Sequence, residues 1–171
     1  GGGSKPIRAL LIGLDGAGKT AILRQAAGDG ATTPEPTTGF TVEDIKINKK
    51  ATLSVVDVAG METTRPLWRH QYVDLQAVVF VVDSADKERM PEATKELHKA
   101  MKEVDKKVPL LVFANKQDLE GAATVEEITT SLMLKNLEHN RTWHVVGCSA
   151  ASGEGIKEGL SWVPKNLEEE Q

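Results

Sequence analysis

The sequence predicts an α/β protein in which a six-stranded, mostly parallel sheet with one antiparallel edge strand carries helices on both faces. Short apolar runs alternate with longer segments whose apolar residues recur every three or four positions. Several of the short runs are apolar at consecutive positions, which is typical of parallel strands buried on both faces. Strands that alternate with helices in this way indicate a doubly wound parallel sheet.

The elements follow in chain order. We expect strands in the apolar runs at residues 7–13, 51–58, 77–84, 108–116 and 142–150. We expect helices at residues 19–27, 90–104, 124–132 and 155–167. The remaining strand lies in FTVEDIKINKKATLSVVDV, where two strand-like runs are joined by Asn-Lys-Lys with no room for a helix. This segment predicts a hairpin, so one edge strand is antiparallel.

Local residues predict three helix boundaries. The first helix ends at Gly28. Thr124, followed three residues later by Glu127, fits a capping box at the start of the third helix. Pro164 lies inside the last helix and is expected to kink or shorten it.

Length and charge limit the class of protein. The 171 residues fit one domain, which we place at residues 5–171, after a Gly-Gly-Gly-Ser at residues 1–4 that we interpret as a cloning scar. The net charge of −4 gives no reason to expect nucleic acid as a partner. A single cysteine, Cys148, excludes an internal disulfide and fits a reducing compartment. No apolar run reaches the roughly 18 residues that span a bilayer.

The segment GLDGAGKT, residues 13–20, follows the first strand and precedes the first helix. Its spacing, Gly13-x-x-x-x-Gly18-Lys19-Thr20, fits a phosphate-binding loop. Glycines let backbone N–H groups turn inward around phosphate oxygens, and the N-terminal end of the helix adds positive charge. Lys19 can reach the outer phosphates, and the Thr20 hydroxyl can ligate Mg²⁺. The segment therefore predicts a nucleotide phosphate site.

Two more strand ends carry residues suited to a nucleotide. Asp57 in VVDVAG can hold the Mg²⁺ shell, and the N–H of Gly60 can approach a terminal phosphate. Asp118 in FANKQD offers two acceptors for the N1–H and N2 amine of guanine, and adenine lacks that amine. Asn115 can bond the base and brace the loop, and the Lys116 stem can lie over the ring.

The final strand ends in Cys-Ser-Ala, residues 148–150. Such small residues allow a backbone N–H to approach the guanine carbonyl. We do not expect a catalytic thiol at Cys148, because the sequence indicates no base near it. Four motifs in this order at successive strand ends are far more specific than any one of them.

These motifs resemble those of the Arf and Arf-like small GTPases, from Lys5 to Leu167. The resemblance is carried by GLDGAGKT, PTTGF, DVAG, RPLWRHQY, FVVDSAD, ANKQDL and CSAASGEGIKEGL. RPLWRH and NKQDL separate the Arf branch from Ras- and Rab-like branches. The resemblance implies the small G domain of the P-loop NTPases and a molecular switch that binds GTP or GDP with Mg²⁺. It also implies hydrolysis of GTP to GDP and phosphate.

The resemblance further implies a role for each matching residue. Thr37 in PTTGF joins Thr20 as a Mg²⁺ ligand in the GTP state, and Asp57 holds a metal-bound water. Gly60 contacts the γ-phosphate and forms the catalytic set with Lys19 and Thr37. The hairpin corresponds to the segment that slides along the sheet between nucleotide states. The implied nucleotide-binding residues are Asp15, Gly16, Ala17, Gly18, Lys19, Thr20, Ala21, Thr37, Gly60, Asn115, Lys116, Asp118, Cys148, Ser149 and Ala150.

One departure from the family pattern concerns hydrolysis. The family reads Trp-Asp-Val-Gly-Gly-Gln where this chain reads VDVAGM, residues 56–61. Met61 replaces the glutamine that orients the attacking water, and a thioether is a weak acceptor that donates no hydrogen bond. Hydrolysis is therefore expected to be slow. Met61 is either a natural divergence, which the accompanying Ala59 favours, or an engineered change that traps one nucleotide state.

Partners are expected on two segments. By resemblance, effector, exchange-factor and GTPase-activating proteins contact residues 29–50 and 57–75. Phe40 keeps one of three aromatic positions that Arf proteins commonly display, but Gln71 occupies another and Val56 the third. The standard Arf effectors and exchange factors are therefore poor guides to the partners of this protein. Trp68 is either an anchor for a partner or a partly buried core aromatic.

The family also implies a location. Its members act in membrane traffic or organelle-surface signalling, and they are cytoplasmic and peripheral on an intracellular membrane when GTP-bound. The membrane contact is expected from an amphipathic N-terminal segment ahead of Lys5.

Two other functions remain open. The chain could be a nearly hydrolysis-inactive binding module that stays GTP-bound and is controlled by nucleotide exchange alone. A P-loop kinase or ATPase is disfavoured, because it would have no use for Asp118 and the sequence contains no evident lid or second substrate site.

Overall fold

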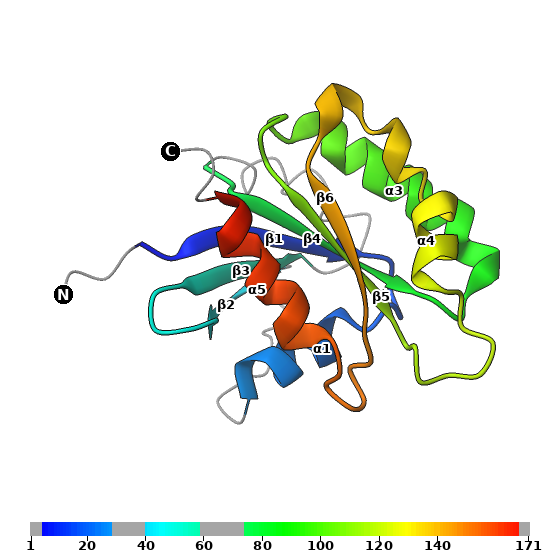
Figure 1. The fold of residues 1–171 in the computed structure, drawn as a ribbon, viewed down its shortest axis with the longest axis horizontal. Coiled ribbons are helices and arrows are strands. Elements are labelled where there is room, and N and C mark those ends of the chain that lie inside the picture. The colour runs from blue at the N-terminus through cyan, green and yellow to red at the C-terminus, as the bar shows by residue number, and fades with distance from the viewer. Residues whose placement is uncertain (1–4, 29–39, 59–73, 168–171) are drawn as a thin grey trace.

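The computed structural model describes residues 5–28, 40–58 and 74–167. Its centre is a six-stranded sheet with the order β2-β3-β1-β4-β5-β6 (Figure 1). Every neighbouring pair is parallel except β2 with β3, which confirms the predicted sheet with one antiparallel edge strand. The strands are β1 (Ile7–Gly13), β2 (Phe40–Lys46), β3 (Thr52–Val58), β4 (Ala77–Asp83), β5 (Leu110–Asn115) and β6 (Trp143–Gly147).

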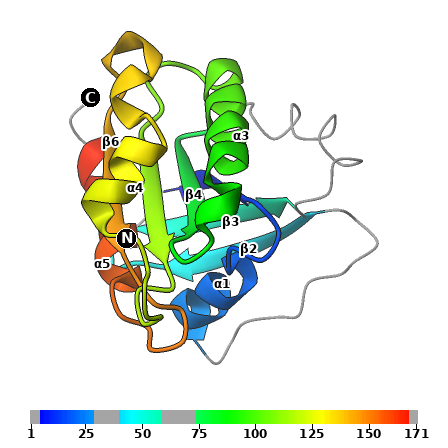
Figure 2. The same cartoon turned by 90° about the vertical axis from the view of Figure 1, so that its right-hand side faces the viewer.

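Helices cover both faces of the sheet, as predicted. Within the described residues, α1 and α5 lie on one face and α3 and α4 on the other (Figure 2). Three short 3-10 turns complete the described elements. The elements are α1 (Lys19–Ala27), η3 (Lys87–Arg89), α3 (Met90–Glu103), α4 (Val125–Ser131), η4 (Leu134–Asn136), η5 (Glu138–Asn140) and α5 (Ile156–Leu167).

The central strand β1 shows why its apolar residues are consecutive. Leu10 and Ile12 belong to the hydrophobic cluster under α3 and α4. Ala9 and Leu11 point the other way, into the cluster under α1 and α5. All four side chains are buried, because successive residues of a strand face opposite sides of the sheet and both sides are covered.

The predicted hairpin is present. β2 pairs with β3 in antiparallel register from Phe40 opposite Val58 to Lys46 opposite Thr52. In the turn between them, the Asn48 side-chain oxygen accepts from the backbone N–H of Lys50 at 2.7 Å and of Ala51 at 2.9 Å. Asparagine suits this position because its side chain bonds the backbone two and three residues ahead.

The helix boundaries agree with the sequence in two cases out of three. α1 ends at Ala27 with Gly28 as its C-terminal cap. Thr124 and Glu127 form the expected capping box, with bonds of 3.1 and 3.0 Å. The expected shortening at Pro164 is wrong, because α5 continues through this residue to Leu167. Pro164 is buried beside Val163, and only the last turn follows it, so packing can offset one lost backbone bond.

The parallel strands bring their carboxyl ends to one edge of the sheet. β1 lies between β3 and β4. The chain therefore passes from β1 to β2 and β3 at one edge of the sheet and then crosses back to β4, on the other side of β1. Open α/β sheets bind ligands in the crevice outside the carboxyl ends of the strands, at this kind of switch point. The glycine-rich segment after β1 occupies that position.

Candidate functional site

The loop after β1 needs glycine at two places because other backbone or side-chain atoms lie close to it. A Cβ on Gly13 would collide with the carbonyl oxygen of Val81 on the neighbouring strand. A Cβ on Gly18 would collide with the side-chain nitrogen of Asn115, and Gly18 has a φ of 100°, in the left-handed region. These glycines let the loop turn tightly against β4 and β5.

The loop leads directly into the N-terminus of α1. Gly18 caps this helix without any side-chain hydrogen bond, and the first turn contains no acidic residue. Thr20 and Ala21 are exposed in that first turn. The first N–H groups of a helix have no partner within it, and the helix dipole adds positive charge there. This end of α1 can therefore receive an anion.

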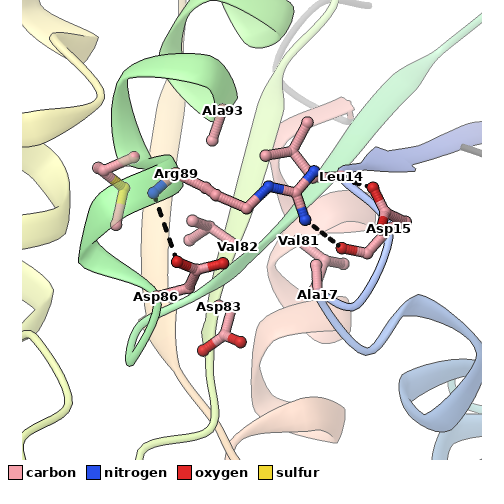
Figure 3. A pocket seen from close by; sticks show the side chains of 10 residues that line it. Leu14, Asp15, Ala17, Val81, Val82, Asp83, Asp86, Arg89 and Ala93 are labelled. Atoms are coloured by element: carbon pink, nitrogen blue, oxygen red, sulfur yellow. Dashed lines mark hydrogen bonds and ion pairs between the residues drawn. The ribbon is translucent and has the colours of Figure 1, made fainter. Parts of the chain in front are cut away.

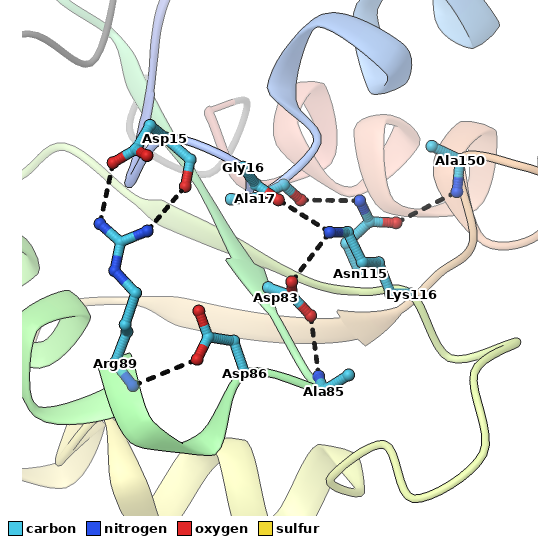
Figure 4. Close-up of polar contacts among 10 residues, drawn as sticks. All are labelled: Asp15, Gly16, Ala17, Asp83, Ala85, Asp86, Arg89, Asn115, Lys116 and Ala150. Atoms are coloured by element: carbon cyan, nitrogen blue, oxygen red, sulfur yellow. Dashed lines mark hydrogen bonds and ion pairs between the residues drawn. The ribbon is translucent and has the colours of Figure 1, made fainter.

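Asn115, at the end of β5, connects three segments that are distant in sequence (Figure 4). Its side-chain nitrogen donates to the carbonyl of Ala17 at 2.9 Å, and its oxygen accepts from the N–H of Ala150 at 3.1 Å. The residue is only 1% exposed, so these bonds form away from competing water. The bracing role expected for Asn115 is present in this geometry.

Lys116 reaches back to the glycine-rich loop. Its ammonium donates to the carbonyl of Gly16 and to the carboxylate of Asp83, both at 2.8 Å (Figure 4). The backbone of Lys116 has a φ of 68°, which turns the chain at this point. Sequence reasoning missed Asp83, although its place at the end of β4 put it on the same edge as the other site residues.

Asp118 is exposed, and a side chain from another loop holds its carboxylate. The Ser149 hydroxyl donates to an Asp118 oxygen at 2.9 Å and accepts from the N–H of Ser152 at 3.2 Å. Ser149 is 3% exposed, so its position is well determined by packing. The loop after β5 and the loop after β6 are thus joined at Asp118.

Cys148 is structural in this geometry. It is buried, and its backbone carbonyl accepts from Gln117 at 3.0 Å. Burial raises the pKa of the Cys148 thiol to about 12, which leaves almost no thiolate at neutral pH. The expectation that Cys148 is not a catalytic thiol fits these observations.

Lys19, the first residue of α1, and Asp57, near the end of β3, form a largely buried pair of opposite charges. The Lys19 nitrogen lies 3.8 Å from an Asp57 oxygen, and each side chain is 10% exposed. Burial lowers the pKa of Lys19 and raises the pKa of Asp57, so their mutual attraction does not offset the loss of water. Within the described residues, that Asp57 oxygen has no hydrogen-bond partner.

Several predicted site residues lie outside the described residues. These are Thr37 and Gly60 of the catalytic set, the departures Ala59 and Met61, the aromatic Trp68, and parts of the two partner segments. Among the residues that the structure does describe, no three His, Cys, Asp or Glu side chains gather into a metal cluster. No helix in the same part of the chain combines the length and the apolar character that crossing a membrane requires.

Two contacts of the site were not anticipated from the sequence. Gln25 on α1 donates to the carbonyl of Ala150 at 2.8 Å, so the loop after β6 is held from two sides. Arg89, at the end of η3, donates to Asp15 in the glycine-rich loop. Neither residue belongs to a motif, and only the folded chain brings them to the edge of the sheet.

The sheet order and the glycine-rich loop at its switch point define the small G domain of the P-loop class. Comparison with known proteins narrows this class. A sequence model of the ADP-ribosylation factor family (Arf) matches residues 1–167. The chain therefore belongs to the ADP-ribosylation factor family of small GTPases.

Individual relatives agree. ADP-ribosylation factor-like protein 1 of Saccharomyces cerevisiae is 47% identical over 171 residues, which is 99% of this chain and 92% of the relative. ADP-ribosylation factor-like protein 3 of Caenorhabditis elegans is 44% identical over 164 residues, which is 95% of this chain and 89% of the relative. The structure of the Arl6 BBS3 small GTPase from Trypanosoma brucei with the bound nucleotide analogue GppNp superposes with a TM-score of 0.86 at 29% identity. That match covers 98% of this chain and all of the other.

Proposed function

We propose that this protein is a molecular switch that binds GTP and GDP with Mg²⁺ at the carboxyl edge of its sheet. The observation that carries the proposal is the Asn115 side chain, which joins the phosphate-type loop at Ala17 to the loop after β6 at Ala150. In this proposal, one ligand contacts both loops, with its phosphates at the first and its base at the second, as a nucleotide can. Family membership supports the same conclusion.

The phosphates are placed at the loop and at the start of α1. The chain supplies backbone N–H groups there, and Lys19 supplies a buried cation. Burial lowers the pKa of Lys19, so an anion nearby favours its charged form, and phosphate oxygens are strong acceptors for an ammonium group. Lys19 therefore binds the outer phosphates in this proposal.

The residues fit Mg²⁺ on the other member of the pair. Asp57 presents a buried carboxylate oxygen without a hydrogen bond among the described residues, and Mg²⁺ prefers such hard oxygen ligands or water held by them. The Thr20 hydroxyl, in the first turn of α1, is the second protein group, and Thr37 joins it in the GTP state. When bound, the ion neutralises charge on the phosphate oxygens.

Guanine is assigned to Asp118. Its carboxylate is held by Ser149 at 2.9 Å and has the two acceptors that the N1–H and N2 amine of guanine require. A kinase or ATPase would have no use for this fixed pair of acceptors. Lys116 and the backbone of Cys148, Ser149 and Ala150 complete the surroundings of the base.

Displacement of fluorescent GDP by GTP and by ATP tests the guanine assignment. We expect at least about 100-fold more ATP than GTP for half displacement, because a site built to pair a donor discriminates strongly against a ligand without it. Equal displacement by the two nucleotides would overturn the assignment and favour the ATPase alternative.

Hydrolysis is proposed to be slow in the isolated protein. Intrinsic hydrolysis by the type case of small GTPases is on the order of 10⁻⁴ per second, and Met61 removes the side chain that orients the water. The alternative is a protein that hardly hydrolyses GTP and is controlled by exchange alone. Accelerating partners remain compatible with both, since a partner can supply an arginine in trans.

Single-turnover phosphate release measures this directly. The series is the parent, Met61→Gln, Ala59→Gly and the double variant. We expect Met61→Gln to raise the rate, either alone or only with Ala59→Gly if alanine restricts the loop. A parent rate equal to that of an ordinary Arf-like protein would contradict the proposal, and Glu62 and His70 would then be the first residues to test.

Partners are proposed on residues 29–50 and 57–75. Within the described part of these segments, β2 is an edge strand, and Val42 on it is 55% exposed. An unpaired strand edge with an exposed apolar side chain is a natural surface for another protein. We further propose that the protein is cytoplasmic, acts in membrane traffic or organelle-surface signalling, and docks on a membrane in the GTP state through an N-terminal segment.

A further inference from the structure

We propose that Arg89 is a clamp that holds the phosphate-binding loop from the side of α3 and slows the release of nucleotide. The inference rests on the proposed function, because it concerns how that same loop keeps its ligand. Arg89 ends η3 and lies 74 residues from Asp15 in the chain. Its guanidinium donates to the Asp15 carboxylate at 2.8 Å and to the Asp15 backbone carbonyl at 3.1 Å.

The Arg89 contact completes a pattern of three. The carbonyl groups of residues 15–17 each accept from a side chain of another element, namely Arg89, Lys116 and Asn115 in that order (Figure 4). In a planar trans peptide the N–H points opposite to the carbonyl. A side chain that fixes the Asp15 carbonyl therefore also fixes the direction of the Gly16 N–H. Two of these three side chains, Asn115 and Lys116, lie at the end of β5. Arg89 is the third, and it approaches the loop from η3 at the start of α3.

The Arg89 side chain spans the distance between the phosphate-binding loop and the start of α3. A small pocket, open to solvent, lies there, and the Arg89 side chain extends across it (Figure 3). Its lining includes Leu14, Val82 and Ala93. The guanidinium therefore supplies a direct polar connection between the start of α3 and Asp15 of the loop.

The guanidinium is itself held in position. Its Nε donates to a Glu92 oxygen at 3.1 Å, and the Arg89 backbone N–H donates to Asp86 at 3.4 Å. The hydrogen bond from Arg89 lowers the pKa of Asp15, which agrees with a real attraction between the two groups. The Asp15 side chain is 79% exposed, and isolated exposed ion pairs contribute little. The effect on release is therefore expected to be moderate.

The test is the dissociation rate of fluorescent GDP from the Mg²⁺-loaded protein. In Arg89→Ala we expect release to be about threefold to tenfold faster, with the association rate and the midpoint of thermal unfolding close to those of the parent. Arg89→Lys keeps the charge but not the planar fork, so release should be faster than in the parent and slower than in Arg89→Ala. Arg24→Ala, an exposed arginine on α1, is the matched control and should leave release unchanged.

Salt gives a second readout that a purely structural role would not move. Raising the ionic strength from about 0.05 to about 0.5 M should accelerate release from the parent more than from Arg89→Ala, because salt screens an exposed ion pair. Equal release rates for the parent and Arg89→Ala, or equal acceleration in Arg24→Ala, would overturn the clamp. A parent that binds neither GDP nor GTP would instead overturn the proposed function, and the clamp with it.

Discussion

The two ends of the candidate site are built differently. The base end consists of residues 115–118 and 148–150, and the phosphate end consists of Lys19, Thr20 and Asp57. At the base end, buried Asn115 and Ser149 make hydrogen bonds of 2.9 to 3.1 Å to groups on other segments. At the phosphate end, two buried opposite charges lie 3.8 Å apart, and one Asp57 oxygen lacks a hydrogen bond among the described residues.

This difference indicates how the two ends contribute to binding. The base end is held by hydrogen bonds among the chain's own groups, and in the proposed function the fixed direction of its acceptors selects one base. At the phosphate end, burial lowers the pKa of Lys19 and raises the pKa of Asp57, so in the proposed function a polyphosphate with a metal ion stabilises the charged forms of both groups. Selectivity is therefore assigned to the first end, and most of the affinity to the second.

The largest loss of affinity is expected at Lys19. Lys19→Ala removes the buried cation that faces the phosphates, and a charged hydrogen-bonding group in such a place contributes about 3 kcal/mol, or roughly two decades of affinity. Calorimetric titration with GDP and with GTP should show a loss of about 100-fold or more for both. Lys99→Ala, on the exposed face of α3, is the control. A loss below about threefold would mean that affinity does not come from the phosphate end.

A loss of stability is expected at Asn115. Asn115→Ala leaves the carbonyl of Ala17 and the N–H of Ala150 without their partner, at a cost of about 1–3 kcal/mol for each group that stays buried. Because each kcal/mol shifts the midpoint by about 2–4 °C in a domain of this size, the midpoint of thermal unfolding should fall by at least about 4 °C. Asn166→Ala is the matched control, since among the residues that the structure describes that amide bonds within its own helix, to Trp162. Equal midpoints for the two variants would show that the base end is not held together as described.

A smaller effect is expected at Ser149. Ser149→Ala removes the hydroxyl that donates to Asp118, so the carboxylate keeps its acceptors but loses its fixed direction. We expect GDP affinity to fall by about threefold to tenfold. Ser161→Ala removes a hydroxyl that donates to Lys157 within α5 and should leave GDP affinity unchanged. Unchanged GDP affinity in Ser149→Ala would mean that Asp118 needs no positioning partner.

The sequence predicted the parallel strands because strands buried on both faces have consecutive apolar residues, as in β1. It predicted the antiparallel edge strand because the turn at Asn48 leaves no room for a helix. It also placed Asn115, Asp118 and Ser149 on one edge, since parallel strands end together. It placed α5 correctly but was wrong to allow a shortening at Pro164, a buried residue through which the helix continues to Leu167. Sequence prediction succeeded where the local pattern determines the structure, as in β1 and the hairpin. It failed at Pro164, where contacts with the rest of the fold also matter.

The polar contacts between loops could not be predicted in the same way. Sequence reasoning placed the Lys116 stem over the base ring, and the structure adds that its ammonium bonds Gly16 and Asp83. Arg89 meets Asp15 across a separation of 74 residues, and no local pattern encodes such a distance. These bonds depend on how two loops approach each other in space, which is determined only when the whole sheet is assembled.

Asp118→Asn tests the central claim, that the base end selects guanine, most directly. Competition of GDP with xanthosine diphosphate should show that the parent prefers GDP and that the variant prefers the xanthine nucleotide. The preference should reverse because an asparagine donor pairs with the acceptor that xanthine has in place of the guanine amine. Asp44→Asn, an exposed carboxylate on β2, should behave like the parent. An Asp118→Asn variant that binds GDP as tightly as the parent would contradict the account.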